Sequence, residues 1–288
     1  MDELEQCVGS AEAFLSTLWR QAPAVLRPAA PPVELLSVAD VLAILDDGLL
    51  GGPYVRLFTA DGRVPADRYC LARWVSGEPV PGYIDPAAVH ELLHMHGATV
   101  LLRHIGQWHR GIRDFIGGLS VRLHRRVEAF FVLSSRQPTA AHRDDADLLV
   151  VQVSGAKRWR IYPGPADGHW VPGPTGGDLG APILDAVLHR GEVLYVPRGF
   201  AHDATTESAA PSAHLALAIR EAGTEHLLTA TRGMLATGIQ LPARPLTDTA
   251  LTAAARALIG HMSDRLNAIT PEAVVAAARA IARPSREA

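Results

Sequence analysis

The chain has 288 residues, 48% of them hydrophobic and 20% charged, so it can bury a large core and is not a globally disordered protein. Its net charge of −3 does not indicate binding to nucleic acid or to an anionic membrane, and its apolar runs are far shorter than the roughly 18 residues that span a bilayer. The opening residues MDELEQ do not resemble an export signal and the two cysteines suit a reducing compartment, so we expect a cytoplasmic protein without nucleic-acid or membrane partners.

The first 125 residues combine helical and strand patterns. Apolar residues recur at helical spacing in four segments, which predicts helices at 10–22, 38–46, 85–96 and 108–125. We expect the last of these helices to be interrupted at Gly117 and Gly118, because glycine weakens a helix interior. Short runs rich in branched and aromatic residues predict strands at 54–58, 68–74 and 98–105.

From residue 129 the pattern changes to short strands separated by glycine and proline. Strands are predicted at 129–135, 147–153, 157–163, 192–197 and 214–220. Such a series indicates an all-β sandwich or a small barrel, with a long glycine- and proline-rich loop inside it. Beyond about residue 221 the sequence is helical again. We therefore expect a β-rich domain with an N-terminal helical extension at 1–220, and a helical segment at 221–288.

His142, Asp144 and His202 could hold one metal ion. Residues i and i+2 of a strand point to the same face, so His142 and Asp144 can reach a common ion. His202 follows the predicted strand 192–197 and could supply a third donor from a neighbouring strand. Two imidazoles and one carboxylate that leave open positions are typical of non-haem Fe(II) oxygenases. A His-x-Asp pattern alone arises easily by chance among 13 histidines. The prediction of a metal site therefore depends on the position of this pattern at the start of a β-rich run.

Lys157 is the single lysine among 27 basic residues. A genome rich in G and C replaces lysine by arginine wherever either serves, so a retained lysine suggests a position that needs a compact ammonium. Alternation along the predicted strand places Lys157 on the same face as Trp159 and Ile161, which suit a packed interior. A buried ammonium needs a counter-ion, which would be either an acidic side chain or the carboxylate of a bound cosubstrate.

The segment HELLH at 90–94 offers a competing metal site. It fits the pattern in which two histidines one helical turn apart bind zinc and a glutamate acts as base. The predicted helix is short, and Val100 stands where one group of such proteases has its third histidine. A third ligand would have to come from elsewhere, for example from Glu128. The alternatives are zinc proteolysis and a helix whose histidines lie on the surface or next to another site.

Two stretches of the sequence resemble the JmjC-type cupin oxygenases, and most closely their ribosomal-oxygenase-like branch. They are HRDDADLLVVQVSGAKRWRIY at 142–162 and GEVLYVPRGFAH at 191–202. Upstream, FLSTLWRQAPAVLRP and GATVLLRHIGQWHRGI resemble the segments that precede the barrel in this branch. The likeness covers roughly residues 11–220 and depends mainly on the first two stretches together.

The resemblance implies a mainly β protein with flanking helices, in which a double-stranded β-helix of the cupin or jelly-roll type is followed by a C-terminal helical segment. It implies an Fe(II)-dependent dioxygenase whose metal is held by His142, Asp144 and His202. Lys157 would pair with the distal carboxylate of the cosubstrate 2-oxoglutarate, assisted by the hydroxyl of Ser134 or Ser135. With O₂, the reaction would yield succinate, CO₂ and a hydroxylated product.

The substrate implied by the resemblance is an amino-acid side chain in a protein or peptide, and stable hydroxylation is expected rather than demethylation. Members of this branch usually have a helical dimerisation segment and then a winged-helix domain after the barrel. Residues 221–288 are long enough for the dimerisation segment but too short for both parts, so we expect a homodimer. The expected lack of a winged-helix domain weakens the assignment of a ribosomal-protein substrate. It leaves open the alternative that the enzyme hydroxylates a free amino acid or a natural-product intermediate. Two other classes are the zinc metalloprotease and a non-enzymatic cupin that binds a metal or a small ligand.

Overall fold

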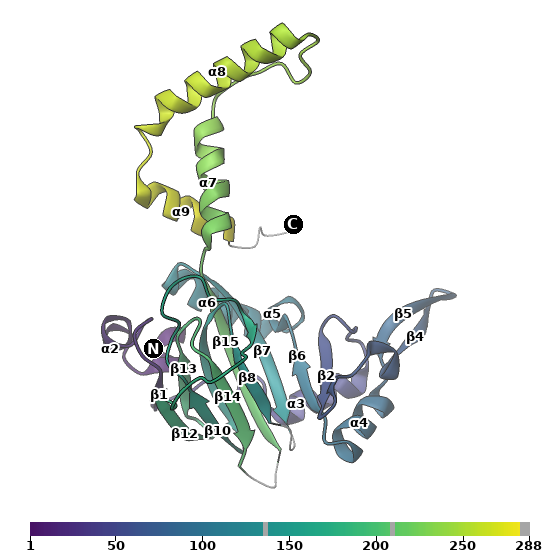
Figure 1. Ribbon diagram of the computed structural model, residues 1–288. Coiled ribbons are helices and arrows are strands. Elements are labelled where there is room, and N and C mark those ends of the chain that lie inside the picture. The colour runs from purple at the N-terminus through teal and green to yellow at the C-terminus, as the bar shows by residue number, and fades with distance from the viewer. Residues whose placement is uncertain (135–137, 208–210, 283–288) are drawn as a thin grey trace. The chain divides into compact units, whose positions relative to one another are not determined.

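Two antiparallel β-sheets face each other in the first of two structural units of the chain (Figure 1). The computed structural model describes residues 1–134, 138–207 and 211–282. Its first unit consists of residues 1–123 and 127–220, and its second of residues 124–126 and those from 221 onward.

The larger sheet has eight strands in the order β1-β13-β9-β15-β7-β6-β2-β3. Their bounds are Ala24–Leu26 for β1, Val55–Thr59 for β2, Gly62–Arg63 for β3, Thr99–Leu102 for β6, Arg126–Ser134 for β7, Asp147–Ser154 for β9, Val193–Val196 for β13 and Ser212–Arg220 for β15. The smaller sheet has five strands in the order β11-β8-β14-β10-β12. Their bounds are Thr139–Arg143 for β8, Ala156–Ile161 for β10, Gly173–Pro174 for β11, Leu184–His189 for β12 and His202–Thr206 for β14. A separate hairpin is formed by β4 (Cys70–Val75) and β5 (Glu78–Ile84).

Strand β9 shows how the larger sheet is buried on both faces. Leu149 and Val151 belong to a cluster shared with the N-terminal helices, whereas Leu148 and Val150 pack with residues of the smaller sheet. Because successive side chains of a strand alternate between the two faces, both sets must be apolar, which explains the uninterrupted apolar run in the sequence. The two facing sheets confirm the expected double-stranded β-helix core.

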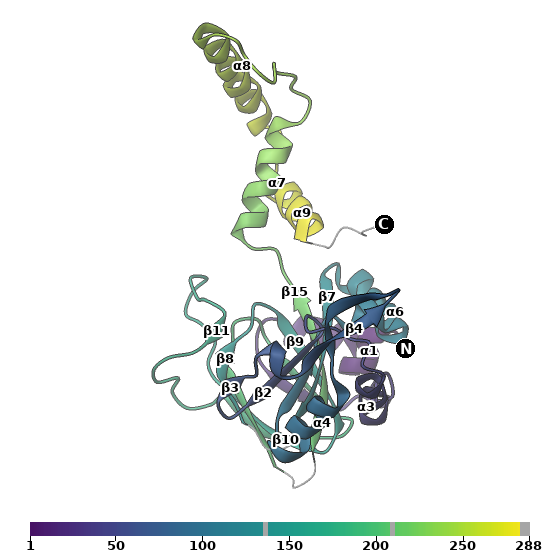
Figure 2. The same ribbon diagram turned by 90° about the vertical axis from the view of Figure 1, so that its right-hand side faces the viewer.

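Helices cover the outer face of the larger sheet, and Figure 2 shows α1 and α3 on the side opposite β8 and β11. The helices of this unit are α1 (Glu3–Val8), α2 (Ala11–Thr17), α3 (Val38–Asp47), α4 (Pro86–Met95), α5 (Ile105–Trp108) and α6 (Arg110–Leu123), with a 3₁₀ turn at Ala66–Arg68. Local sequence starts two of them, because Ser10 and Ser37 each accept a hydrogen bond from a backbone N–H of the first turn.

Several predicted elements differ from the observed ones. The helix expected at 10–22 ends at Thr17, and Trp19 beyond it packs edge-on against Phe14. The helix expected to break at Gly117 and Gly118 is continuous from Arg110 to Leu123. Glycine is useful there because a Cβ at Gly118 would collide with the carboxylate of Glu3 on α1. Strands β8, β12 and β14 have mixed polar sequences and were not predicted as strands.

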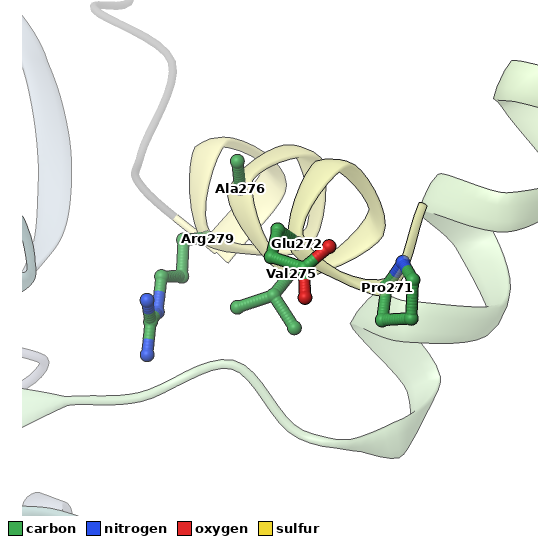
Figure 3. Close-up of a pocket in the computed structure, with 5 residues that line it drawn as sticks. All are labelled: Pro271, Glu272, Val275, Ala276 and Arg279. Atoms are coloured by element: carbon green, nitrogen blue, oxygen red, sulfur yellow. The ribbon is translucent and has the colours of Figure 1, made fainter. Parts of the chain in front are cut away.

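The second unit is helical, as expected, and contains α7 (Thr224–Ala236), α8 (Asp248–Leu266) and α9 (Pro271–Ala282). Glu221 connects its parts, since its carboxylate pairs with Arg125 at 2.8 Å and with Arg279 at 3.1 Å. Figure 3 shows a shallow hollow along α9, lined by Pro271, Glu272, Val275, Ala276 and Arg279. Within the described residues, none of the helices combines the length and apolarity needed to cross a lipid bilayer.

Candidate metal centre

Three potential metal ligands meet where strands β8 and β14 pair. His142 on β8 lies directly opposite His202, the first residue of β14, and Asp144 follows the end of β8. The Nε2 atoms of His142 and His202 lie 3.7 Å and 3.6 Å from Oδ2 of Asp144. All three ligand atoms lie within 4.8 Å of one another, and in the described part of the chain no other set of three His, Cys, Asp or Glu residues does so.

Backbone carbonyls orient both histidine rings. Nδ1 of His142 lies 3.0 Å from the carbonyl oxygen of Ala140, and Nδ1 of His202 lies 3.1 Å from that of Phe200. A carbonyl can only accept, so each Nδ1 carries the proton and each Nε2 presents a lone pair. This outer hydrogen bond is the usual partner of a metal-binding histidine. Both rings therefore have the tautomer that binds a metal through Nε2.

His202 is held in its neutral form. Burial, followed by the neighbouring His142, lowers the pKa of His202 to about 4. Only 2% of its side chain is exposed, whereas the side chain of Asp144 is 41% exposed. The site thus offers the uncharged imidazole of His202, the imidazole of His142 and one partly solvated carboxylate. This set suits a divalent ion that needs deprotonated ligands and a face open to other molecules.

Asp147 ties the start of β9 to the turn that leads into β14. Its carboxylate is fully buried and accepts hydrogen bonds from the hydroxyl of Tyr195 at 3.0 Å and from Nε of Arg20 at 3.1 Å. It also accepts from the backbone N–H of Arg198 at 3.1 Å. These three bonds satisfy the buried charge, and they fix Arg198, four residues before His202.

Lys157 lies inside the barrel on the same face as Trp159. Its side chain is completely buried, and its Nζ lies 3.4 Å from Oγ of Ser134 and 5.7 Å from the centre of the Trp159 ring. Burial lowers the pKa of Lys157 to about 8. Among the described residues no carboxylate pairs with it, so a structural role alone leaves its charge uncompensated. Ser135, the alternative hydroxyl, lies outside the described residues.

Further buried polar atoms around Lys157 have no hydrogen-bond partner in the described structure. They include Oγ1 of Thr206, which lies opposite Lys157 on β14, Nε1 of Trp159 and Nδ1 of His214. The rings of Trp159 and His214 lie 5.4 Å apart. Buried polar groups are normally hydrogen-bonded, so this concentration around an ammonium matches the needs of a small polar ligand with a negative charge.

Sequence reasoning missed Thr206 and His214. The residue His214 opens the predicted strand 214–220, and alternation with Ala216 and Ala218 could have placed it on the interior face. Thr206 carried no comparable signal, because its position opposite Lys157 depends on the register between β10 and β14.

The HELLH segment does not assemble a comparable site. His90 and His94 lie on α4 with their rings stacked at 5.7 Å. Nε2 of His90 lies 2.5 Å from Oδ1 of Asp46. Glu128, which could have been a third ligand, instead lies 2.9 Å from Nε of Arg220. In the described part of the chain these histidines therefore have the surroundings of surface residues.

Known proteins share both the sequence motifs and the fold. Residues 108–227 match the family model described as "JmjC domain". The "Bifunctional lysine-specific demethylase and histidyl-hydroxylase NO66" of Drosophila sechellia is 34% identical over 133 residues, which are 44% of this chain and 20% of that protein. The protein of the same name from Drosophila persimilis is 44% identical over 86 residues, 28% of this chain and 12% of that protein. The chain thus spans about a fifth or less of the length of these relatives.

Two similar solved structures come from Escherichia coli. The X-ray structure of ycfD has a TM-score of 0.57 and 16% sequence identity, and the match covers 92% of this chain and 69% of that one. The structure of "YcfD a Ribosomal oxygenase" in complex with cobalt and 2-oxoglutarate has the same TM-score and identity, with 91% and 67% covered. At this level of identity the likeness concerns the fold, and it confirms the mainly antiparallel cupin-type architecture.

Proposed function

The chain carries a JmjC domain, and from that premise we propose that it is an Fe(II)- and 2-oxoglutarate-dependent oxygenase that hydroxylates an amino-acid side chain of a protein or peptide. The observation that carries the proposal is the combination of a His-Asp-His ligand set with a buried lysine that no carboxylate of the described residues neutralises. A metal ion explains the first feature and a dicarboxylate cosubstrate explains the second.

The ligand set fits iron by its chemistry. His142, Asp144 and His202 offer two imidazole nitrogens and one carboxylate oxygen, with Nδ1 of both rings at a backbone carbonyl and Nε2 left for the metal. Three protein ligands leave open positions on an octahedral ion, which an oxygenase needs for its cosubstrate and O₂. A zinc protease at His90 and His94 lacks such a third ligand among the described residues.

The interior polar atoms fit 2-oxoglutarate. Lys157 would neutralise the distal carboxylate, and the hydroxyls of Ser134 and Thr206 would donate to its oxygens. A carboxylate there would supply the hydrogen-bond partner that Oγ1 of Thr206 lacks and the counter-ion that Lys157 lacks. Lys157, Ser134 and Thr206 would thus hold one carboxylate of a dicarboxylate, and the other would be free to reach a metal held by His142, Asp144 and His202.

Bound Fe(II) and 2-oxoglutarate would supply the oxidising chemistry, in which O₂ is consumed and succinate and CO₂ are released. The chain's own residues prepare this chemistry. The ligand atoms of His142, Asp144 and His202 lie within 4.8 Å of one another, and the apolar cluster around Trp159 and Ile161 excludes water from the interior. Charge neutralisation by Lys157 then keeps a dicarboxylate in a place where it would otherwise be strongly disfavoured.

The class of substrate is supported by the similar proteins. The relatives are named as a histidyl-hydroxylase and lysine-specific demethylase, and the similar structures as a ribosomal oxygenase. Both names describe action on proteins or protein assemblies, which favours a protein side chain over a free amino acid or a natural product. We take hydroxylation as the reaction, as the sequence motifs implied.

We also propose that the helices of the second unit form a homodimer in the cytoplasm. Leu251, Ile259 and Leu266 of α8 are 58%, 66% and 57% exposed. Their spacing places them on one face of the helix, where a second copy of the chain could cover them. The free thiols of Cys7 and Cys70 suit a reducing compartment.

The test is anaerobic addition of Fe(II) and 2-oxoglutarate to the purified protein, with detection of the weak visible charge-transfer band of the chelated pair. We expect the band with the intact chain and its loss in His142→Ala. Circular dichroism shows whether both proteins are folded. A folded intact chain that gives no band contradicts the proposal.

A further inference from the structure

The interior face of the larger sheet continues past the barrel onto strands β6 and β2. Val100 and Leu102 of β6 and Val55 and Leu57 of β2 pack into the helix-side cluster. By alternation, the residues between and beyond them point to the other face. Oγ1 of Thr99 lies 3.2 Å from Oγ of Ser134, whose hydroxyl also approaches Lys157, so this other face is the one that bears the interior of the barrel.

Three arginines occupy this face. Arg56 of β2 lies between Val55 and Leu57, and Arg103 continues the alternation beyond Leu102. Arg63 of β3 pairs directly with Phe58, two residues beyond Arg56, so it shares their face. Arg56 and Arg103 are half-buried, whereas Arg63 is exposed.

Arg220, the last residue of β15, pairs with Glu128 at 2.9 Å. In contrast, none of the guanidinium groups of Arg56, Arg63 and Arg103 pairs with a carboxylate within the described residues. Nε of Arg56 is buried without a hydrogen-bond partner.

Arg103 experiences the resulting positive charge. Its pKa is lowered by burial and then by the charges of Arg56 and Arg63, while Glu128 acts in the opposite direction. Like charges that are half-buried side by side destabilise the free protein. An anion bound between them would remove this cost, and guanidinium groups bind carboxylates with good geometry.

We infer that Arg56 and Arg103 form a recognition site for a carboxylate of the substrate, so that the enzyme selects a side chain that lies within an acidic segment of its target. The inference rests on the proposed function, because it treats this face as the surface along which the substrate approaches the metal ligands. Leu101 and Val132, which lie opposite each other in the same row as Arg56, would contact the apolar parts of the bound segment.

A carboxylate is favoured over the phosphates of a nucleic acid. Nucleic-acid binding normally uses an extended basic surface that contacts many phosphates, whereas this cluster has three arginines and the chain has a net charge of −3. The neighbouring Glu128 is neutralised by its pair with Arg220, so this pair does not extend the basic surface.

The experiment compares three fluorescein-labelled peptides of equal length, each with a central histidine flanked by Glu, Gln or Lys, by fluorescence anisotropy at low salt. We expect the Glu peptide to bind the full-length protein about tenfold more tightly than the Gln peptide, the effect of one or two charge-assisted hydrogen bonds, and the Lys peptide to bind most weakly. The Arg56→Gln/Arg103→Gln variant should bind the Glu and Gln peptides equally. Arg110→Gln/Arg244→Gln removes the same charge elsewhere and should keep the preference.

A charge reversal provides a second test that does not depend on the double variant. Arg103→Glu should shift the preference toward the Lys peptide. Equal binding of all three peptides, or a Glu preference that survives in the double variant, overturns the inference. A third outcome would also overturn the inference. In it, a single-stranded oligonucleotide binds the protein, the Arg56→Gln/Arg103→Gln variant binds it more weakly, and the three peptides bind equally well.

The Fe(II)–2-oxoglutarate band is recorded on the same preparations. We expect it to remain in both double variants, because neither changes the metal ligands or Lys157. Absence of the band from the intact chain would refute the oxygenase while leaving a measured peptide preference intact. The two failures are therefore distinguishable.

Discussion

The ammonium of Lys157 lies 3.4 Å from the hydroxyl of Ser134 inside the barrel, and among the described residues no carboxylate balances its charge. This pairing of a buried cation with a neutral hydroxyl is incomplete in the free protein. A dicarboxylate cosubstrate completes it, and the first two predictions concern this interaction.

Lys157→Met should weaken 2-oxoglutarate binding by about 10- to 100-fold, the value of a charge-assisted hydrogen bond in a buried site. The variant should retain its metal affinity and unfold at an equal or higher temperature, because a buried charge without a partner has been removed. Calorimetric titration of the Mn(II)-loaded protein with 2-oxoglutarate measures the affinity. Unchanged affinity in a folded variant rules out Lys157 as the anchor.

The affinity for 2-oxoglutarate should depend on pH with a definite sign. The pKa of Lys157 is lowered to about 8 by burial, so its ammonium is present below that pH and is lost as the pH rises through it. A bound carboxylate raises this pKa, so the Kd should be constant below about pH 7 and increase by up to about tenfold per pH unit above about pH 8.

The control for the pH dependence is Lys157→Arg, whose guanidinium stays charged throughout this range. Its Kd should be higher than that of the wild type at neutral pH, because the larger group fits poorly, but nearly independent of pH. A wild-type Kd that is flat up to about pH 9.5 would show that another group anchors the cosubstrate.

Metal binding should depend on His142 and not on His94. His142→Ala removes one of the three ligands that lie within 4.8 Å, so we expect at least about a 100-fold loss of Fe(II) affinity, consistent with the effects known for metal-site changes. His94→Ala removes a histidine of the same type from the surface of α4 and should bind Fe(II) as the wild type does. The reverse result would transfer the metal site to the HELLH helix.

Asp147 should be essential for stability. Asp147→Ala leaves Tyr195, Arg20 and the Arg198 backbone without their shared acceptor, which should cost about 3–5 kcal/mol in the free energy of unfolding. Urea denaturation measures this value. The control Asp185→Ala removes a more exposed partner of Arg158 and should cost less than about 1 kcal/mol. Similar losses in both variants would contradict a special role for the Asp147 network.

Self-association should depend on the exposed face of α8. Ile259→Glu places a charge among Leu251, Ile259 and Leu266 and should convert a dimer into a monomer in analytical ultracentrifugation. Ala257→Glu on the same helix lies on the opposite, exposed face and should leave the dimer intact. A wild-type chain that is monomeric at all concentrations would refute the homodimer.

Some features could be predicted because their signals are local. Caps at Ser10 and Ser37 start helices, and a run of apolar residues marks β9, since hydrogen bonds and alternation act within a few residues. The boundary of α2 and the continuity of α6 were predicted wrongly. In α6 the buried residues Ile112, Phe115, Leu119 and Leu123 pack one face of the helix into the core on both sides of the two glycines, a tertiary contribution that local propensity does not include.

The amino-acid sequence by itself determined the mainly β architecture, the identity of the candidate ligands and the interior position of Lys157, because each follows from residue type and periodicity. Only the tertiary structure decided that His142 lies opposite His202, that Thr206 lies opposite Lys157, and that Arg56 and Arg103 share a face without a carboxylate partner. Strand order and register bring these residues together. Register is set by the combined packing of two sheets and their helices, which no single segment of the sequence encodes.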